Sequence, residues 1–291
     1  MTSAPDRLLR RLEWQLHRRV DGRLQGAYRT VWRGAGIDFT DLRQYTPDDD
    51  VRHIDWNVTA RLDEPFVRQY TEDRELTAWM VVDRSASMRF GAAKGPVGTE
   101  LTVALARLLA QGGNRVGAIL YDNASSTVIP PRTGRNQVLR MAKELTRVSA
   151  AARGATTDLG AMLRLAASTT SQRRSLVFVV SDFIGDPGWD RPLTMLSHRH
   201  EVVVLRIVDP VELELPDVGL ILVEDAETGE QVLVDTSDPL LRRRLRAQVA
   251  SREDDIAAGM RTAAVTEHRI STEVDVLASL VQLVRESRRR R

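Results

Sequence analysis

The feature that most constrains the fold is a series of continuous apolar runs that alternate with segments of helical periodicity. Four such runs are LTAWMVVD (76–83), RVGAILYD (115–122), SLVFVVSD (175–182) and EVVVLRIVD (201–209). Strands of a parallel sheet read this way because both of their faces are buried. The segments 99–111, 135–148, 158–170 and 189–197 between or after these runs repeat apolar residues as helices do. The pattern predicts an α/β fold with a doubly wound, mostly parallel sheet.

Later segments interrupt this rhythm. SSTVIP (125–130) is expected to be an edge strand, and residues 219–235 read as a hairpin that turns around Thr228 and Gly229. A long helix (238–262), a short strand (265–271) and a last amphipathic helix (274–286) follow. We therefore predict an α/β domain over residues 73–291, with the hairpin near 219–235 as an insertion.

The N-terminal part, residues 1–72, is predicted to be a separate helical and loop-rich region. Residues 6–20 repeat apolar side chains at Leu9, Leu12, Leu16 and Val20, as in an amphipathic helix. Residues 30–62 are expected to be loop-rich, and PFVRQY (65–70) reads as a strand. The amphipathic helix packs on a neighbouring domain in one interpretation and lies on a membrane surface in another.

Composition excludes several classes of function. The 42 basic and 40 acidic residues give a formal net charge of +2, which argues against a dedicated nucleic-acid binder. There is no cysteine, so disulfides, thiolate nucleophiles, zinc–thiolate sites and iron–sulfur clusters are excluded. No apolar stretch approaches the roughly 20 residues that span a bilayer. The charged N-terminus lacks the apolar core of a signal peptide, so a cytoplasmic location is expected, with membrane contact at most peripheral.

Oxygen-bearing side chains follow two of the predicted strands. Asp83 ends the first apolar run and is followed by Ser85 and Ser87, and Asp182 ends another run after Ser181. Thr156 and Thr157 stand just before a predicted helix. Ligands of open α/β sheets bind at the carboxyl ends of the strands. An all-oxygen set there suits Mg²⁺ or Mn²⁺. Helix capping by the same Asp, Ser and Thr residues is the alternative.

Enzymatic alternatives lack their required groups. A haloacid-dehalogenase-type phosphatase needs a second Asp two residues after the first, where Ser85 stands here. No Gly-x-Ser-x-Gly turn, phosphate-binding loop or dinucleotide fingerprint occurs. A Mg²⁺-dependent, phosphatase-like hydrolase that uses the strand-end site is the remaining enzymatic alternative to a binding module.

The pattern Asp83-x-Ser85-x-Ser87, with Thr157 and Asp182 later in the chain, resembles the metal-ion-dependent adhesion site (MIDAS) of von Willebrand factor A domains. Thr157 is the threonine chosen because it abuts Asp158-Leu159-Gly160, as the family's threonine does. The resemblance implies a von Willebrand factor A-like fold and one Mg²⁺ or Mn²⁺ held by these five residues. It also implies a partner protein that offers an acidic side chain to the metal. Asp83 is expected at the solvent-facing end of its strand.

The stretch before this domain is similar to the bacterial family called domain of unknown function 58. The matching positions are Phe39, Arg43, Tyr45, Asp49, Asp50, Arg52, Ile54, Asp55, Trp56, Ala60 and Arg61, and ETGEQVLVD and ISTEVD also match. The resemblance covers residues 30–285. It implies an assembly or maturation factor that works with a MoxR-type AAA+ ATPase.

Acidic and basic residues are interleaved over residues 38–61. One interpretation is a partner surface beside the metal. The other is an internal network of arginines and carboxylates that holds this segment on the sheet, with Trp56 as a buried apolar anchor.

Overall fold

The computed structural model describes residues 36–289, except 48, 63, 74–75, 123–124, 148–156, 171–172 and 225–230. The expected helix at 6–20, the hairpin turn at Thr228 and Gly229, and Thr156 lie outside the described residues. The described chain divides into two compact units, residues 36–76 and 77–289. Each unit is considered by itself.

The larger unit is built on a six-stranded sheet. Its strand order is β10-β7-β6-β3-β4-β5, and every pairing is parallel except that of the edge strand β5 with β4. The strands are β3 (Thr77–Asp83), β4 (Arg115–Asp122), β5 (Ser125–Arg132), β6 (Leu176–Ser181), β7 (Glu201–Val208) and β10 (Thr266–Ser271). The chain passes from β3 to β4 and β5 on one side of β3, and then returns to place β6 on the other side of β3. The strand order therefore reverses between β3 and β6, the two strands that lead into Asp83 and Asp182.

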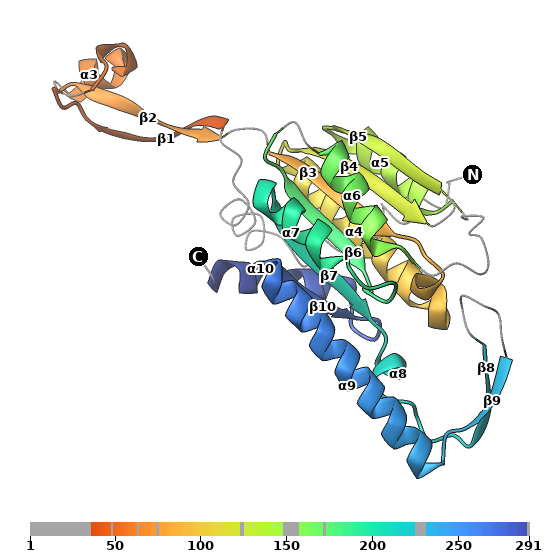
Figure 1. The fold of residues 1–291 in the computed structure, drawn as a ribbon. Helices are drawn as coiled ribbons and strands as arrows, with labels where there is room; N and C mark the ends of the chain where they lie inside the picture. The colour runs from red at the N-terminus through yellow and green to blue at the C-terminus, as the bar shows by residue number, and fades with distance from the viewer. Residues whose placement is uncertain are drawn as a thin grey trace. The chain divides into compact units, whose positions relative to one another are not determined.

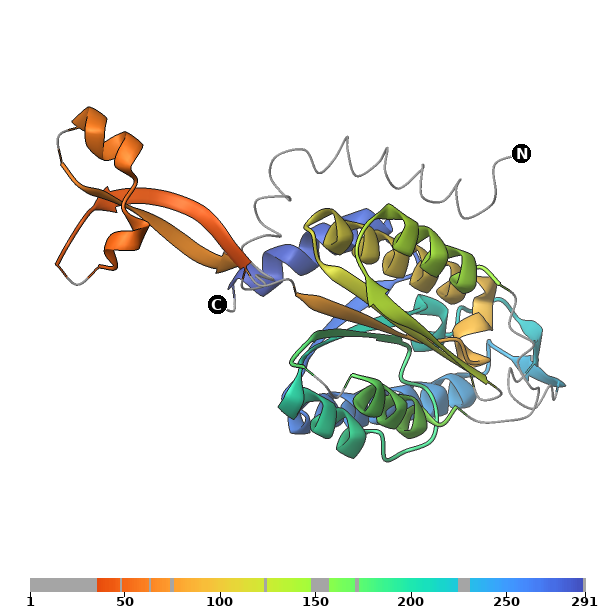
Figure 2. The same cartoon turned by 90° about the horizontal axis from the view of Figure 1, so that it is seen from above.

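Helices cover both faces of this sheet (Figures 1 and 2). One layer contains α4 (Lys94–Gln111), α5 (Arg135–Leu145) and α10 (Val276–Arg289), and the other contains α6 (Leu159–Thr169), α7 (Asp190–Arg199) and α9 (Pro239–Thr262). Two short helices, η2 (Ser87–Ala92) and α8 (Pro210–Leu213), follow strands β3 and β7. The doubly wound, mostly parallel sheet predicted from the sequence is confirmed.

The core consists of the apolar strands and the helix faces that pack on them. Every residue of β6 is buried, and Met80 and Phe178 of the central strands are fully buried. On one face, Trp79, Leu163 and Val179 belong to a single cluster of buried side chains that extends to α7 and α9. Burial on both faces explains why the strand sequences are continuously apolar rather than alternating.

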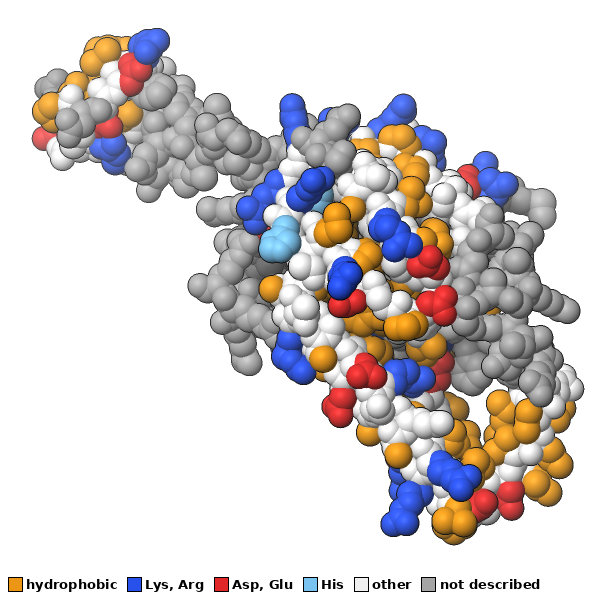
Figure 3. Space-filling model, in the orientation of Figure 1, with side chains coloured by type: hydrophobic (Ala, Val, Ile, Leu, Met, Phe, Trp, Pro, Cys, Tyr) orange, Lys and Arg blue, Asp and Glu red, His pale blue; other side chains and the backbone are white. Residues whose placement is uncertain are grey.

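The predicted hairpin is also present. Strands β8 (Leu220–Glu224) and β9 (Gln231–Asp235) pair antiparallel and form a separate two-stranded sheet near the start of α9 (Figure 1). Its apolar side chains are unusually exposed, and Figure 3 shows them gathered on this ribbon. The exposed residues are Leu220, Leu222, Val232 and Leu233.

The smaller unit differs from the loop-rich region that the sequence predicted. Strands β1 (Gly36–Gln44) and β2 (Phe66–Asp73) form an antiparallel ribbon, and η1 (Val51–His53) and α3 (Trp56–Leu62) lie between them in the chain. The expectation of loops over 30–62 is thus wrong for the described residues, although the strand expected at 65–70 is confirmed. Arginine–carboxylate pairs lie within this unit: Arg43 contacts Asp49, and Arg52 contacts Asp50 at 2.9 Å.

The Trp56 side chain is 68% exposed, so no contact inside the smaller unit buries it, and its packing on the sheet domain stays a prediction. If only the smaller unit surrounds Trp56, Trp56→Ala should change the free energy of unfolding by no more than about 0.5 kcal/mol, as exposed substitutions usually do. A urea titration of both proteins measures this difference. A loss of several kcal/mol would instead mean that Trp56 is buried in solution.

No helix among the described residues combines the length and the apolar character needed to cross a lipid bilayer.

Candidate metal centre

Asp83 lies at the carboxyl end of β3 and is held there by hydrogen bonds. Its Oδ2 accepts a 2.7 Å bond from the Ser181 hydroxyl, and its Oδ1 accepts a 2.9 Å bond from the Ser85 backbone N–H. The side chain is only 2% exposed, so the expected solvent-facing position is wrong. Burial raises the pKa of Asp83 to about 6, and the charge of Asp182 acts in the same direction. The buried surroundings therefore disfavour two ionised carboxylates, those of Asp83 and Asp182, without a compensating positive charge.

The two serines connect Asp83 of β3 to Asp182, which directly follows β6. The Ser85 and Ser87 hydroxyls lie 2.9 Å apart, and the Ser87 hydroxyl donates to Asp182 Oδ1 at 3.3 Å. Both side chains are buried. Helix capping does not explain them, because η2 begins after Ala86 and neither η2 nor α4 has a side-chain cap. Among the candidate residues, Asp83, Ser85, Ser87 and Asp182 are thus in one hydrogen-bonded cluster.

Thr157 reaches this region from the segment before α6. Its carbonyl oxygen accepts a 3.1 Å bond from the Asp186 backbone N–H in the loop after β6. The fit is close, since a Cβ atom on Gly185 would lie 2.4 Å from that oxygen. The next residue, Asp158, caps α6 by accepting from the Ala161 N–H at 2.7 Å. Thr157 itself is 0% exposed, and its hydroxyl has no hydrogen-bond partner among the described residues.

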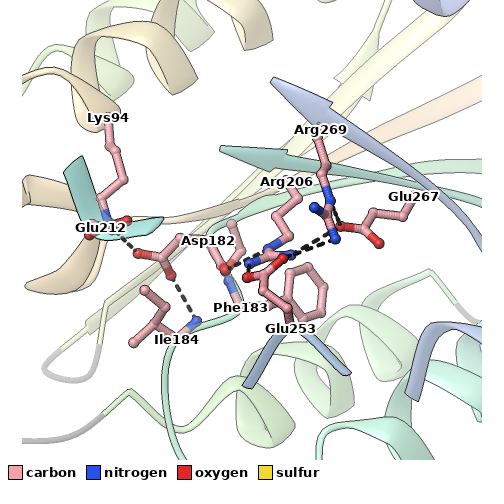
Figure 4. A network of polar contacts seen from close by, with 10 residues as sticks. Lys94, Asp182, Phe183, Ile184, Arg206, Glu212, Glu253, Glu267 and Arg269 are labelled. Atoms are coloured by element: carbon pink, nitrogen blue, oxygen red, sulfur yellow. Dashed lines mark hydrogen bonds and ion pairs between the residues drawn. The ribbon is translucent and has the colours of Figure 1, made fainter. Parts of the chain in front are cut away.

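A buried lysine completes the cluster, and the sequence patterns did not reveal it. Lys94, at the start of α4, is 0% exposed and places its Nζ 2.7 Å from Asp182 Oδ2 and 2.5 Å from Glu212 Oε1 (Figure 4). Desolvation raises the pKa of Glu212, and the Lys94 ammonium opposes that change. The one signal in the sequence is that Lys94 and Lys143 are the only lysines in an arginine-rich chain.

A second buried cation, Arg206, contacts the backbone of Asp182. Arg206 of β7 is 2% exposed and donates from Nε to the Asp182 backbone carbonyl at 3.2 Å (Figure 4). Its guanidinium also pairs with Glu253 of α9 and Glu267 of β10, and Arg269 pairs with both glutamates. This network ties the peptide at Asp182 to the neighbouring strand and to α9.

These residues fit a small divalent cation. Buried polar atoms nearly always have a partner, so the unpaired Thr157 hydroxyl calls for an explanation. A bound cation supplies one, because a hydroxyl oxygen can serve as its ligand. Asp83, Ser85, Ser87 and Asp182 are the other residues that could hold it. In the described part of the chain, no group of three or more His, Cys, Asp or Glu residues forms a metal site. The candidate centre therefore depends on hydroxyl ligands.

Solved structures that match this chain share little sequence with it. BatB from Bacteroides thetaiotaomicron aligns with 74% of this chain and 99% of its own, at 14% identity and a TM-score of 0.47. A von Willebrand factor type A protein from Catenulispora acidiphila aligns with 75% of this chain and 43% of its own, at 14% identity and a TM-score of 0.41.

Proteins found by sequence have a higher percentage identity to this chain. An uncharacterized protein of Mycobacterium tuberculosis H37Rv is 37% identical over 284 residues, which cover 97% of this chain and 89% of the relative. An uncharacterized protein of Mycobacterium avium is 31% identical over 56% of this chain and 95% of its own length. Residues 41–255 match the family model described as protein of unknown function DUF58. The chain belongs to the DUF58 family.

Proposed function

We propose that this protein is a protein-interaction module whose recognition site contains a divalent cation, Mg²⁺ or Mn²⁺. The single observation that carries the proposal is the buried Thr157 hydroxyl, which lacks a partner among the described residues and belongs to a residue whose backbone carbonyl bonds to the loop after Asp182. Asp83, Ser85, Ser87, Thr157 and Asp182 are the proposed ligands, directly or through water. Their position at the reversal of strand order is where open α/β sheets bind ligands.

Charge explains why such a site recognises an acidic group. The Lys94 ammonium is shared between Asp182, at 2.7 Å, and Glu212, at 2.5 Å, and three of the five proposed ligands are neutral hydroxyls. A divalent cation bound here supplies positive charge that these residues only partly neutralise, and so it attracts a further anionic ligand. A carboxylate on a partner protein is such a ligand.

The metal is tested by thermal unfolding. At a hundredfold excess over Kd, a ligand of the folded state adds about 2.7 kcal/mol to the free energy of unfolding. For a domain of this size, we expect Mg²⁺ to raise Tm by roughly 5–10 °C relative to EDTA. Asp83→Asn keeps the shape of the side chain but removes its charge, and it should abolish that rise.

Asp122→Asn is the matched control. Asp122 also ends a buried parallel strand, but its carboxylate accepts from the Ser125 N–H of its own turn at 2.7 Å. This variant should keep the full response to Mg²⁺. Equal Tm values of the wild type in Mg²⁺, Mn²⁺ and EDTA would rule out the metal site.

The first partner to test is a MoxR-type AAA+ ATPase or its client, on the strength of the family resemblance alone. The proposal requires that binding of the purified ATPase disappears in EDTA and with Asp83→Asn. Equal binding of the ATPase with and without the metal would mean that another surface of the protein recognises it. Hydrolysis of a general phosphatase substrate, lost in Asp83→Asn, would favour the hydrolase instead.

A further inference from the structure

A cavity of about 340 Å³ adjoins the candidate metal centre and shares Asp83 with it. Its lining comes from the end of β3, η2, the first turns of α4 and the end of α5. Met88 and Leu145 belong to this lining and are themselves 2% and 6% exposed. The cavity thus offers an apolar surface next to a polar centre, a combination typical of ligand pockets.

Three arginines also line the cavity. Arg84 is held in place, because its guanidinium donates to the backbone carbonyls of Glu144, at 3.4 Å, and of Arg147. Arg147 forms an ion pair of 3.0 Å with Glu144, and its side chain is 70% exposed. The Arg89 side chain is exposed and makes no hydrogen bond or ion pair with the described residues.

The lining of the cavity contains three guanidinium groups and one carboxylate, that of Asp83, which accepts hydrogen bonds from Ser181 and Ser85. Glu144, outside the lining, pairs with Arg147. The Arg89 guanidinium has no carboxylate partner among the described residues. Anionic groups are therefore favoured at the mouth, and guanidinium groups bind carboxylates in a bidentate manner.

We propose that this cavity is the second half of the recognition site and receives an apolar side chain from an acidic peptide segment of the partner protein. The inference rests on the proposed function, since the acidic residue beside that apolar side chain is the one that reaches the metal centre. Other acidic residues of the segment pair with Arg89 and Arg147. The partner is thereby specified as a protein segment in which carboxylates flank a leucine-sized or larger apolar residue.

The test is a selection from a phage-displayed library of random 12-residue peptides on the full chain in Mg²⁺. We expect enriched peptides to combine Asp or Glu with an adjacent Leu, Ile, Met or Phe. Charge reversal by Arg89→Glu should weaken a synthetic copy of such a peptide at least about tenfold. Thr99→Phe, which places a ring in the cavity, should weaken it similarly. Arg140→Glu, an exposed position of α5 outside the cavity, is the matched control and should bind like the wild type.

Failure of this inference is distinguishable from failure of the proposed function. Peptides that bind only in Mg²⁺ but bind Arg89→Glu and Thr99→Phe as tightly as the wild type would overturn the cavity proposal and leave the metal-dependent site intact. Peptides that bind equally in EDTA and lose affinity in both variants would overturn the metal-dependent site and leave the cavity proposal intact. Enrichment of basic peptides, or no enrichment, would overturn the cavity proposal.

Discussion

Lys94→Met is expected to destabilise the metal-free protein by about 3–5 kcal/mol, the usual effect of removing one partner from a buried ion pair. Lys94 is 0% exposed, and its ammonium contacts the buried Asp182 and the half-buried Glu212. Without it, Asp182 becomes an uncompensated charge in the interior, close to Asp83. Methionine has a similar shape, so the loss reports the charge rather than a cavity.

Urea unfolding in EDTA measures this loss, and the chain provides its own control. Lys143 is the only other lysine and is exposed on α5, so Lys143→Met should change stability by less than about 0.5 kcal/mol. Added Mg²⁺ should stabilise Lys94→Met more than the wild type, because the cation then compensates Asp182. A Lys94→Met protein that is as stable as the wild type in EDTA would contradict the buried ion pair.

Arg206→Met is expected to cost about 3 kcal/mol at pH 7. It removes the donor to the Asp182 carbonyl and leaves Arg269 as the remaining ion-pair partner of Glu253 and Glu267 among the described residues. Arg269→Met should cost less, because that side chain is 52% exposed. Urea titrations of both variants test the order. Equal losses of unfolding free energy in the two variants would mean that the deeper burial of Arg206 does not increase its contribution to stability.

The pH dependence of the same network has a definite sign. The hydrogen bond from Arg206 lowers the pKa of Glu253, with burial opposing it. The pairing therefore stabilises the fold above the unfolded-state pKa of a glutamate, about 4.3, and this contribution disappears as pH falls through the lower folded-state value. We expect the difference in stability between the wild type and Arg206→Met to shrink from pH 7 toward pH 3. A difference that stays constant over this range would contradict the linkage.

Much of the larger unit could be predicted from local patterns. Burial on both faces makes a parallel strand continuously apolar, so β3, β4, β6 and β7 are visible in the sequence. The carboxyl ends of parallel strands meet at one edge of the sheet, and for that reason Asp83 and Asp182 were expected together. Their hydrogen-bonded link through Ser87 agrees with this expectation.

The smaller unit was less predictable, and the reason is physical. Strand β1 exists through its pairing with β2, and the propensity of an isolated strand is weak and depends on its neighbours. Gly36 and the polar residues after it therefore looked like loop.

By itself, the sequence determined the parallel sheet, the order of its helices and strands, and the oxygen-bearing residues at two strand ends. These are consequences of side-chain periodicity and of strand direction, which act over a few residues. Only the tertiary structure decided that Asp83 is buried, that Lys94 lies on Asp182, and that Arg206 holds its carbonyl. Lys94 and Asp182 are 88 residues apart in the chain. Their contact exists because β6 pairs directly with β3, while α4 covers one face of both, and that long-range pairing leaves no trace in local periodicity.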